Sequence, residues 1–155
     1  MDERSKFIIL IAEDDEGHAK LIRKNLIASG VTNEIITLNN GEKVLDYIYE
    51  NLEKIRESPR FKYILLLDIR MPKVDGIEVL EKIKSHKDLK KIPVIMITTT
   101  DDPKEIEECY FLGCNYYINK PVDYEKFVEV ITKLGGFIKT LNDSDNMNFD
   151  FRVLG

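Results

Sequence analysis

The sequence predicts an α/β fold built on a doubly wound, five-stranded parallel sheet. Short apolar runs alternate five times with longer segments of helical period, and most of these runs are continuously apolar, as in strands covered on both faces. The chain has 155 residues, of which 43% are hydrophobic, and this suits one domain with a substantial core. Right-handed crossovers then place helices on both faces of the sheet.

The expected strands are short. Residues 63–68 form the most apolar run and hence the natural centre of the sheet, and residues 7–12 are also apolar throughout, so these two strands should be neighbours. The five predicted strands cover residues 7–12, 34–38, 63–68, 93–98 and 116–119.

Apolar residues at helical spacing mark the segments between and after the strands. Gly30 suits the C-terminal cap of the first helix, and the second helix is expected to run unbroken to the turn at Ser58-Pro59. Asp102 and Pro103 are typical of a helix start. The marking residues are Ala19, Ile22 and Leu26; Val44, Ile48, Leu52 and Ile55; Ile77, Leu80 and Ile83; Ile106 and Tyr110; and Phe127, Val130 or Ile131, Leu134 and Ile138.

Composition excludes several classes of function. The formal net charge of -5 disfavours nucleic acid as a partner, because an acidic domain gains little at a phosphate backbone. No apolar run approaches the roughly 20 residues of a membrane helix, and the charged amino terminus is not a signal peptide. Cys109 and Cys114 match neither a CxxC pair nor a zinc site, so we expect reduced thiols in a cytoplasmic protein.

Polar side chains follow four of the predicted strands. Glu13 and Asp14 come after the first strand, Asp68 after the third, Thr98 after the fourth and Lys120 after the fifth. Ligands of open parallel sheets bind beyond the carboxyl ends of the strands, so these side chains should converge there.

Three converging carboxylates repel one another, and a divalent cation relieves that repulsion. Oxygen ligands in an open cleft favour Mg²⁺. With Lys120 adding a further positive charge, the site suits a phosphoryl group, and Asp68 is the best candidate nucleophile because carboxylates form aspartyl-phosphates.

Each of these residues also has a simpler interpretation. Asp14 or Asp15 can be a helix N-cap, Lys120 a surface lysine, and the threonines from Thr98 to Thr100 mere strand formers. We interpret His18 as a solvated helix residue. The combination at four strand ends carries the functional hypothesis, since the single signals are weak.

The sequence resembles a response-regulator receiver domain, the phosphoacceptor part of two-component signalling with a flavodoxin-like (βα)5 fold. The resemblance covers residues 6–141. Four motifs carry it: residues 11–15 (Ile-Ala-Glu-Asp-Asp), 66–76 (Leu-Leu-Asp-Ile-Arg-Met-Pro-Lys-Val-Asp-Gly), 93–99 (Pro-Val-Ile-Met-Ile-Thr-Thr) and 113–121 (Gly-Cys-Asn-Tyr-Tyr-Ile-Asn-Lys-Pro).

The resemblance implies a role for each site residue. Asp68 would accept a phosphoryl group from a phosphohistidine, and Lys120 and Thr98 would contact its oxygens. Tyr117 would change rotamer and so alter a protein-interaction surface. Mg²⁺ would be held by the carboxylates and the backbone carbonyl of one further residue: Glu13, Asp14, Asp68 and Arg70. The Lys120-Pro121 peptide would be cis.

The resemblance also implies partners. The longer second helix and its connection are similar to those of stand-alone regulators paired with phytochrome-like or other multi-sensor histidine kinases. The output would be contact with a downstream protein, because no output domain fits after residue 141. The tail, residues 142–155, is either frayed or an extended arm whose apolar side chains, from Phe149 to Leu154, dock on the domain or join a homodimer through the last helix.

Other functions fit the sequence less well. A haloacid-dehalogenase-like phosphatase needs a second acid two residues after its nucleophile, where this chain has Arg70. A flavodoxin-like cofactor binder needs a phosphate loop in place of the acidic residues after the first strand, so no organic cofactor is expected. Histidine phosphotransfer proteins are helical bundles, so the alternating strands of this chain exclude that class. A receiver-like fold that binds partners without being phosphorylated is an alternative that the sequence leaves open. The expected function is thus a phosphoacceptor switch that assists its own phosphorylation and dephosphorylation, rather than an enzyme.

Overall fold

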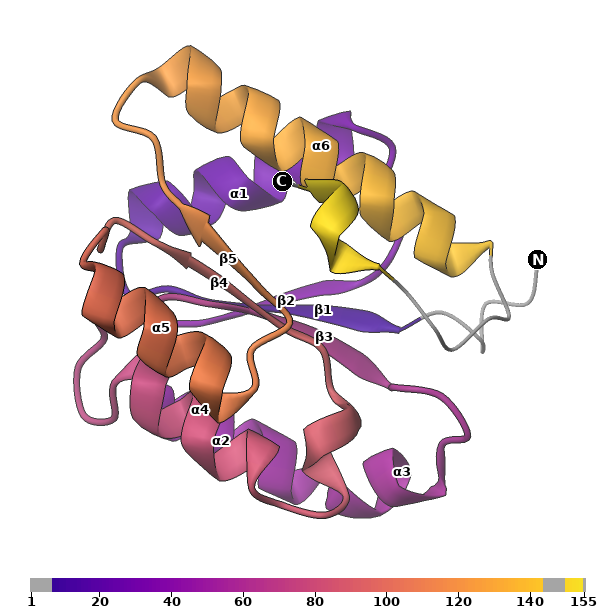
Figure 1. Cartoon of the computed structure of the whole chain (residues 1–155). Coiled ribbons are helices and arrows are strands. Elements are labelled where there is room, and N and C mark those ends of the chain that lie inside the picture. The colour runs from indigo at the N-terminus through magenta and orange to yellow at the C-terminus, as the bar shows by residue number, and fades with distance from the viewer. Residues whose placement is uncertain (1–6, 144–149, 155) are drawn as a thin grey trace.

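The computed structural model describes residues 7–143 and 150–154, which form a five-stranded parallel sheet between two layers of helices (Figure 1). The strand order is β2-β1-β3-β4-β5. The strands are β1 (Ile8–Ala12), β2 (Ile35–Leu38), β3 (Tyr63–Leu67), β4 (Val94–Thr98) and β5 (Tyr116–Asn119). The predicted fold class is confirmed, and β1 and β3 are neighbours as expected.

Helices cover both faces of the sheet, with α1 and α6 on one face and the others on the opposite face (Figure 1). They are α1 (Glu16–Ala28), α2 (Gly41–Glu50), α3 (Leu52–Glu57), α4 (Gly76–Lys84), α5 (Pro103–Leu112) and α6 (Tyr124–Asn142), with 3₁₀ turns η2 (Leu89–Lys91) and η3 (Phe151–Leu154). Within residues 7–143 and 150–154, no helix combines the length and the apolar character that crossing a membrane requires.

Side chains of the central strands alternate between two apolar cores. Leu10 and Leu65 pack against the side of α2, α4 and α5, whereas Ile9 and Ile64 pack against α1 and α6. All four side chains have no exposed surface. Burial on both faces explains why the predicted strands are continuously apolar rather than alternating.

Aspartates cap most of the long helices. Gly30 adopts a φ of 101° just after α1, a left-handed conformation that glycine tolerates best, and Pro103 occupies the first turn of α5 as predicted. The carboxylates that accept a backbone N–H at the helix starts are those of Asp15, Asp75, Asp102 and Asp123. The alternative interpretation as an N-cap therefore applies to Asp15 and not to Asp14.

The second predicted helix is in fact two helices, α2 and α3, which meet at Asn51. The Asn51 side chain donates a hydrogen bond to the Tyr47 carbonyl at 2.7 Å, and its backbone N–H bonds to Ile48 at 3.1 Å. Asparagine side chains compete with the helix for backbone partners in this way. Apolar residues keep helical spacing on both sides of Asn51, so their pattern did not predict that the helix ends there.

The implied cis peptide before Pro121 is absent, since every peptide bond between described residues is trans. The two isomers of a peptide bond before proline differ by only about 0.5–1 kcal/mol in short peptides, so tertiary context decides between them. The sequence motif alone was therefore an insufficient basis for this prediction.

The end of the tail forms the 3₁₀ turn η3 rather than an extended arm. In a 3₁₀ turn, residues three apart lie on the same side, so Phe151 and Leu154 both face the core under α6. The Phe151 ring lies 5.0 Å from the ring of Phe137, centroid to centroid. Phe149, another residue of the predicted arm, lies outside the described residues.

The buried thiols generate a prediction about alkaline stability. Burial raises the pKa of Cys109 from 9.0 to about 11 and that of Cys114 from 9.0 to about 12. Between pH 9 and pH 11 the unfolded chain releases these protons while the folded chain keeps them, so the free energy of unfolding falls as pH rises. Each thiol contributes at most about 1.4 kcal/mol per pH unit.

Urea unfolding at pH 8, 9, 10 and 11 measures this slope. The Cys109→Ala/Cys114→Ala double variant is expected to be less stable at pH 8 because of its cavities, yet to lose stability less steeply above pH 9. Equal slopes for both proteins would contradict the assignment to the thiols.

Candidate functional site

The register of β1 and β3 places Glu13 beside Asp68. Ala12 pairs with Leu67, so the residues that follow these two leave the sheet side by side. The Asp68 backbone N–H also donates to the Ala12 carbonyl at 3.0 Å. Both acidic side chains are buried, and they meet at the carboxyl end of the sheet as predicted.

Asp14 completes a cluster of three carboxylates with these two residues. One oxygen each of Glu13, Asp14 and Asp68 lies within 4.8 Å of the others. Asp14 is exposed, and a hollow of about 630 Å³ opens beside Glu13 and Asp14, bounded also by Thr37 and Lys43. The cluster is thus buried on one side and open to solvent on the other.

Lys120 follows β5 and extends its ammonium into the carboxylate cluster. The Nζ atom donates to the Glu13 carboxylate in a very short contact and to Asp68 Oδ2 at 3.3 Å. Only 5% of the residue is exposed. The simpler interpretation of Lys120 as a surface lysine is therefore wrong.

The cluster holds more negative charge than Lys120 compensates. Burial raises the pKa of the Glu13 carboxyl to about 7; the hydrogen bond from Lys120 opposes this shift, and the charge of Asp68 adds to it. A carboxyl whose pKa is raised near neighbouring anions indicates that a further positive charge would be favourable here.

A divalent cation fits this donor set. Asp68 Oδ1 is buried and has no hydrogen-bond partner among the described residues, although buried carboxylate oxygens are normally paired. Together with the exposed oxygen ligands of Asp14, this unpartnered atom is the type of hard ligand that Mg²⁺ prefers.

Thr98 ends β4 at the same end of the sheet. It is completely buried, and its Oγ1 accepts a hydrogen bond from the Thr100 N–H at 3.4 Å. Because β4 lies between β3 and β5, Thr98 ends its strand between the two strands that lead into Asp68 and Lys120.

The loop after β4 is tied to β5 by side chains of that strand. The Tyr117 hydroxyl donates to the Thr100 carbonyl at 2.6 Å, and Asn119 Nδ2 donates to the same carbonyl at 3.0 Å. Burial raises the pKa of Tyr117, which keeps its hydroxyl a donor. Sequence reasoning assigned no role to Asn119.

Arg70 lies near the site, but its side chain turns away to α5. Its Nη2 lies 3.2 Å from Glu105 Oε1, and the arginine side chain is 69% exposed. No acidic side chain occupies this position, so the two-carboxylate arrangement of a haloacid-dehalogenase-like phosphatase is missing there.

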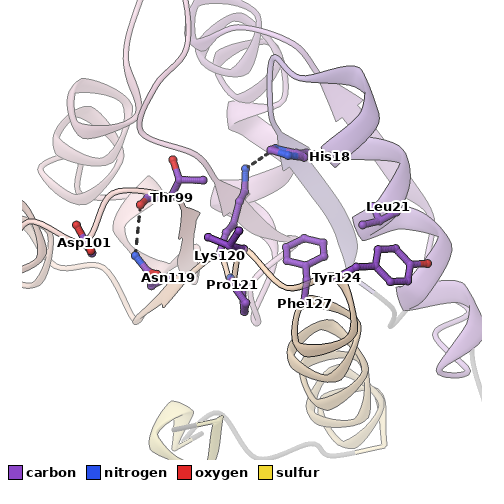
Figure 2. A pocket seen from close by; sticks show the side chains of 10 residues that line it. His18, Leu21, Thr99, Asp101, Asn119, Lys120, Pro121, Tyr124 and Phe127 are labelled. Atoms are coloured by element: carbon purple, nitrogen blue, oxygen red, sulfur yellow. Dashed lines mark hydrogen bonds between the residues drawn. The ribbon is translucent and has the colours of Figure 1, made fainter.

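His18 belongs to the site, contrary to the interpretation as a solvated helix residue. Its Nδ1 contacts Lys120 Nζ at 3.2 Å (Figure 2). The same nitrogen lies 3.8 Å from Glu13 Oε1. The sequence did hold one signal, since His18 is in the first turn of α1, directly after the acidic loop. Its side chain is 45% exposed, which explains why a surface role looked adequate.

A second hollow, of about 480 Å³, lies on the other side of Lys120 (Figure 2). Thr99 and His18 form its polar wall, and Tyr124 and Phe127 of α6 form its apolar wall. Lys120 itself is one of the residues that line this hollow.

Gly76 supports the main chain of Asp68. Its N–H donates to the Ile69 carbonyl at 2.8 Å, and a Cβ added at position 76 would lie 2.1 Å from the Asp68 carbonyl oxygen. The start of α4 can approach the phosphoacceptor candidate this closely because glycine has no side chain.

Known proteins are similar to this chain in sequence and in fold. Response regulator Rcp1 of Synechocystis sp. is 32% identical to the chain over 84% of this chain and 87% of Rcp1. A crystal structure of the Mn²⁺-bound form of Rcp1 gives a TM-score of 0.75 at 28% identity, covering 92% of this chain and 99% of that one.

Two further solved structures are similar. The phosphorylated cyanobacterial phytochrome response regulator RcpA gives a TM-score of 0.77 at 30% identity, covering 88% of this chain and 96% of that one. A response regulator receiver domain from Rhodospirillum rubrum gives a TM-score of 0.79 at 40% identity, covering 86% and 94%.

The resemblance to phytochrome-associated regulators is thereby confirmed. Residues 9–132 match the family described as the response regulator receiver domain, and this match covers most of the chain. The sheet order and the acidic end of the sheet agree with that match. The chain therefore belongs to the response regulator receiver domain family of two-component signalling.

Proposed function

We propose that the chain is a stand-alone response regulator that accepts a phosphoryl group on Asp68 from a phosphohistidine of a sensor histidine kinase. The observation that carries this proposal is the meeting of Glu13, Asp14, Asp68 and Lys120 at one end of the sheet. Within residues 7–143 and 150–154, Asp68 Oδ1 has no hydrogen-bond partner. The carboxylate of Asp68 has two oxygens, so one can hold a metal ion while the other attacks phosphorus.

Transfer of the phosphoryl group from the phosphohistidine to Asp68 needs no further reactant. A carboxylate oxygen of Asp68 attacks phosphorus, the phosphorus–nitrogen bond of the phosphohistidine breaks, and the imidazole leaves with the electron pair. Lys120 neutralises charge on the phosphoryl oxygens, and the Thr98 hydroxyl donates a hydrogen bond to one of them. Because the transition state is loose, positioning and charge supply most of the rate.

The proposed metal ligands are Glu13, Asp14, Asp68 and the backbone carbonyl of Arg70, with Glu13 acting through water. A bound Mg²⁺ supplies positive charge against the phosphoryl oxygens. The relative Rcp1 has been crystallised in a Mn²⁺-bound form, which supports a divalent site in this family.

The proposed output is a change of the surface formed by α5, β5 and α6. If Thr98 moves toward a phosphoryl group, the loop after β4 moves with it. The Tyr117 hydroxyl, which bonds to Thr100 in this loop, then loses or changes its partner. The rotamer change of Tyr117 carries the signal to a downstream protein.

Partners follow from the same proposal. RcpA is a phytochrome response regulator, which favours a phytochrome-like or other multi-sensor kinase as the donor. The reduced, buried Cys109 and Cys114 suit the cytoplasm, where such a kinase domain would meet this chain. A receiver domain spanning residues 6–141 and a homodimer through α6 and the tail stay predictions.

Replacing the nucleophile tests the proposal directly. With acetyl phosphate and Mg²⁺, the wild-type chain is expected to gain one phosphoryl group, and Asp68→Asn none, as measured by intact-protein mass spectrometry. Asp46→Asn, an exposed change on α2, serves as control and should be labelled normally. Labelling of the Asp68→Asn chain would place the nucleophile elsewhere.

Metal binding should depend on Asp14 but not on Asp15. Asp14→Asn is expected to weaken Mg²⁺ binding about tenfold or more, because an anionic ligand is lost. Asp15→Asn keeps the cap of α1 and should bind Mg²⁺ like wild type. Isothermal titration calorimetry measures both dissociation constants, and equal affinities for the two variants would argue against the proposed ligand set.

The relay requires the Thr98 hydroxyl. NMR signals of the Tyr117 ring are expected to shift when acetyl phosphate and Mg²⁺ are added to wild type and to Thr98→Ser. Thr98→Val has nearly the same shape without the hydroxyl, so it should be phosphorylated while its Tyr117 signals stay in place. A full shift in phosphorylated Thr98→Val would show that Tyr117 moves by another route.

A further inference from the structure

The ammonium of Lys120 has three protons and three acceptors around it. Glu13 and Asp68 contact it inside the cluster, and His18 Nδ1 contacts it at 3.2 Å from the half-exposed side (Figure 2). The family resemblance assigns roles to the two acids and to Lys120 but none to position 18. This third contact therefore calls for a physical explanation of its own.

The ammonium of Lys120 must be the donor in its hydrogen bond with His18. A lysine ammonium has donors and no acceptor, so the ring nitrogen that meets it must offer its lone pair. In this contact Nδ1 of His18 is therefore the acceptor.

The position of the imidazole is built into the start of α1. Asp15 Oδ1 accepts the His18 backbone N–H at 3.0 Å, and the Asp15 N–H donates to Glu13 Oε2 at 3.1 Å. Glu13, Asp15, His18 and Lys120 thus form a closed ring of contacts. Within this ring the backbone of His18 is held relative to the buried Glu13–Lys120 pair.

We propose that His18 is a positioning residue, which holds the ammonium of Lys120 in place for phosphoryl transfer at Asp68. The inference rests on the proposed function. Lysine has a long, flexible side chain, and an ammonium restrained in advance stabilises a loose transition state better than one that must be ordered during the reaction. His18 itself touches neither phosphorus nor the attacking oxygen.

Loss of the His18 contact should affect two reactions, the phosphorylation of Asp68 and the hydrolysis of the phosphorylated residue. In phosphorylation by acetyl phosphate, Asp68 attacks phosphorus and acetate leaves with the electron pair of the broken P–O bond. In hydrolysis, water attacks phosphorus, the bond to Asp68 breaks, and inorganic phosphate leaves as the water proton passes to solvent. Lys120 faces similar phosphoryl charge in both steps, so loosening it should slow both.

The test uses the full chain, acetyl phosphate and Mg²⁺. His18→Leu, which has similar bulk and no acceptor, is expected to slow phosphorylation and hydrolysis by about threefold to tenfold each, the effect of losing one charge-assisted hydrogen bond at a half-exposed site. His18→Gln keeps a carbonyl acceptor and should regain most of the rate. Lys24→Ala, an exposed change on α1, should match wild type in both rates.

Two further measurements separate positioning from simple structural damage. Mg²⁺ affinity and the thermal midpoint should be the same in His18→Leu and His18→Gln. The ¹⁵N shift of the Lys120 ammonium, measured without any phosphodonor, should change in His18→Leu and stay close to wild type in His18→Gln. This readout reports the contact even if Asp68 is not phosphorylated.

The outcomes are distinct. Equal rates in His18→Leu and wild type, or equal slowing in His18→Leu and His18→Gln, would overturn the inference while leaving the proposed function intact. A wild-type chain that gains no phosphoryl group on Asp68 would overturn the proposed function, and the kinetic part of this inference with it. An unchanged ammonium shift in His18→Leu would overturn the contact itself.

Discussion

Three carboxylates and one buried ammonium meet at the end of the sheet, and the pairing of the central strands makes this meeting possible. Glu13 and Asp68 can only meet because Ala12 and Leu67 are paired in register. A slip of one residue would turn the side chains to the opposite face of the sheet. The apolar residues of β1 and β3 set the register of the two strands, and this register places the carboxylates of Glu13 and Asp68 side by side.

Hydrogen bonds connect the acidic end of the sheet to the neighbouring edge strand β5. Thr100, two residues beyond the buried Thr98, is held by two side chains of the neighbouring strand, Tyr117 and Asn119. These bonds hold the loop against β5 in this structure. The same strand continues directly into Lys120, so the loop and the buried ammonium are both attached to one short element.

The fold and most of the site were predictable because both follow from general rules. Continuous apolar runs indicate strands buried on both faces, and parallel strands gather their following residues at one edge. This logic was enough to bring Glu13, Asp14, Asp68 and Lys120 together. The roles proposed for Thr98 and Tyr117 needed the family resemblance, because a buried threonine and a tyrosine are ordinary core residues by pattern alone.

What the sequence did not reveal depends on contacts between distant residues or on small differences in energy. The meeting of His18 with Lys120 depends on the direction in which α1 leaves the acidic loop, and no periodicity records that direction. The break at Asn51 depends on one side-chain hydrogen bond within a continuous apolar pattern. The 3₁₀ turn at Phe151 was missed because alternating apolar residues fit an extended arm equally well.

Gly76 has a consequence for how the chain can change over generations. A methyl group at this position would overlap the carbonyl oxygen of Asp68, so even alanine forces the backbone of the proposed phosphoacceptor to shift. Asp68 directly follows β3, and its neighbour Ile69 is buried in one of the two cores, so such a shift reaches the sheet as well as the acidic cluster. Substitution at position 76 is therefore expected to disturb the fold and the site together, which leaves little room for any residue but glycine.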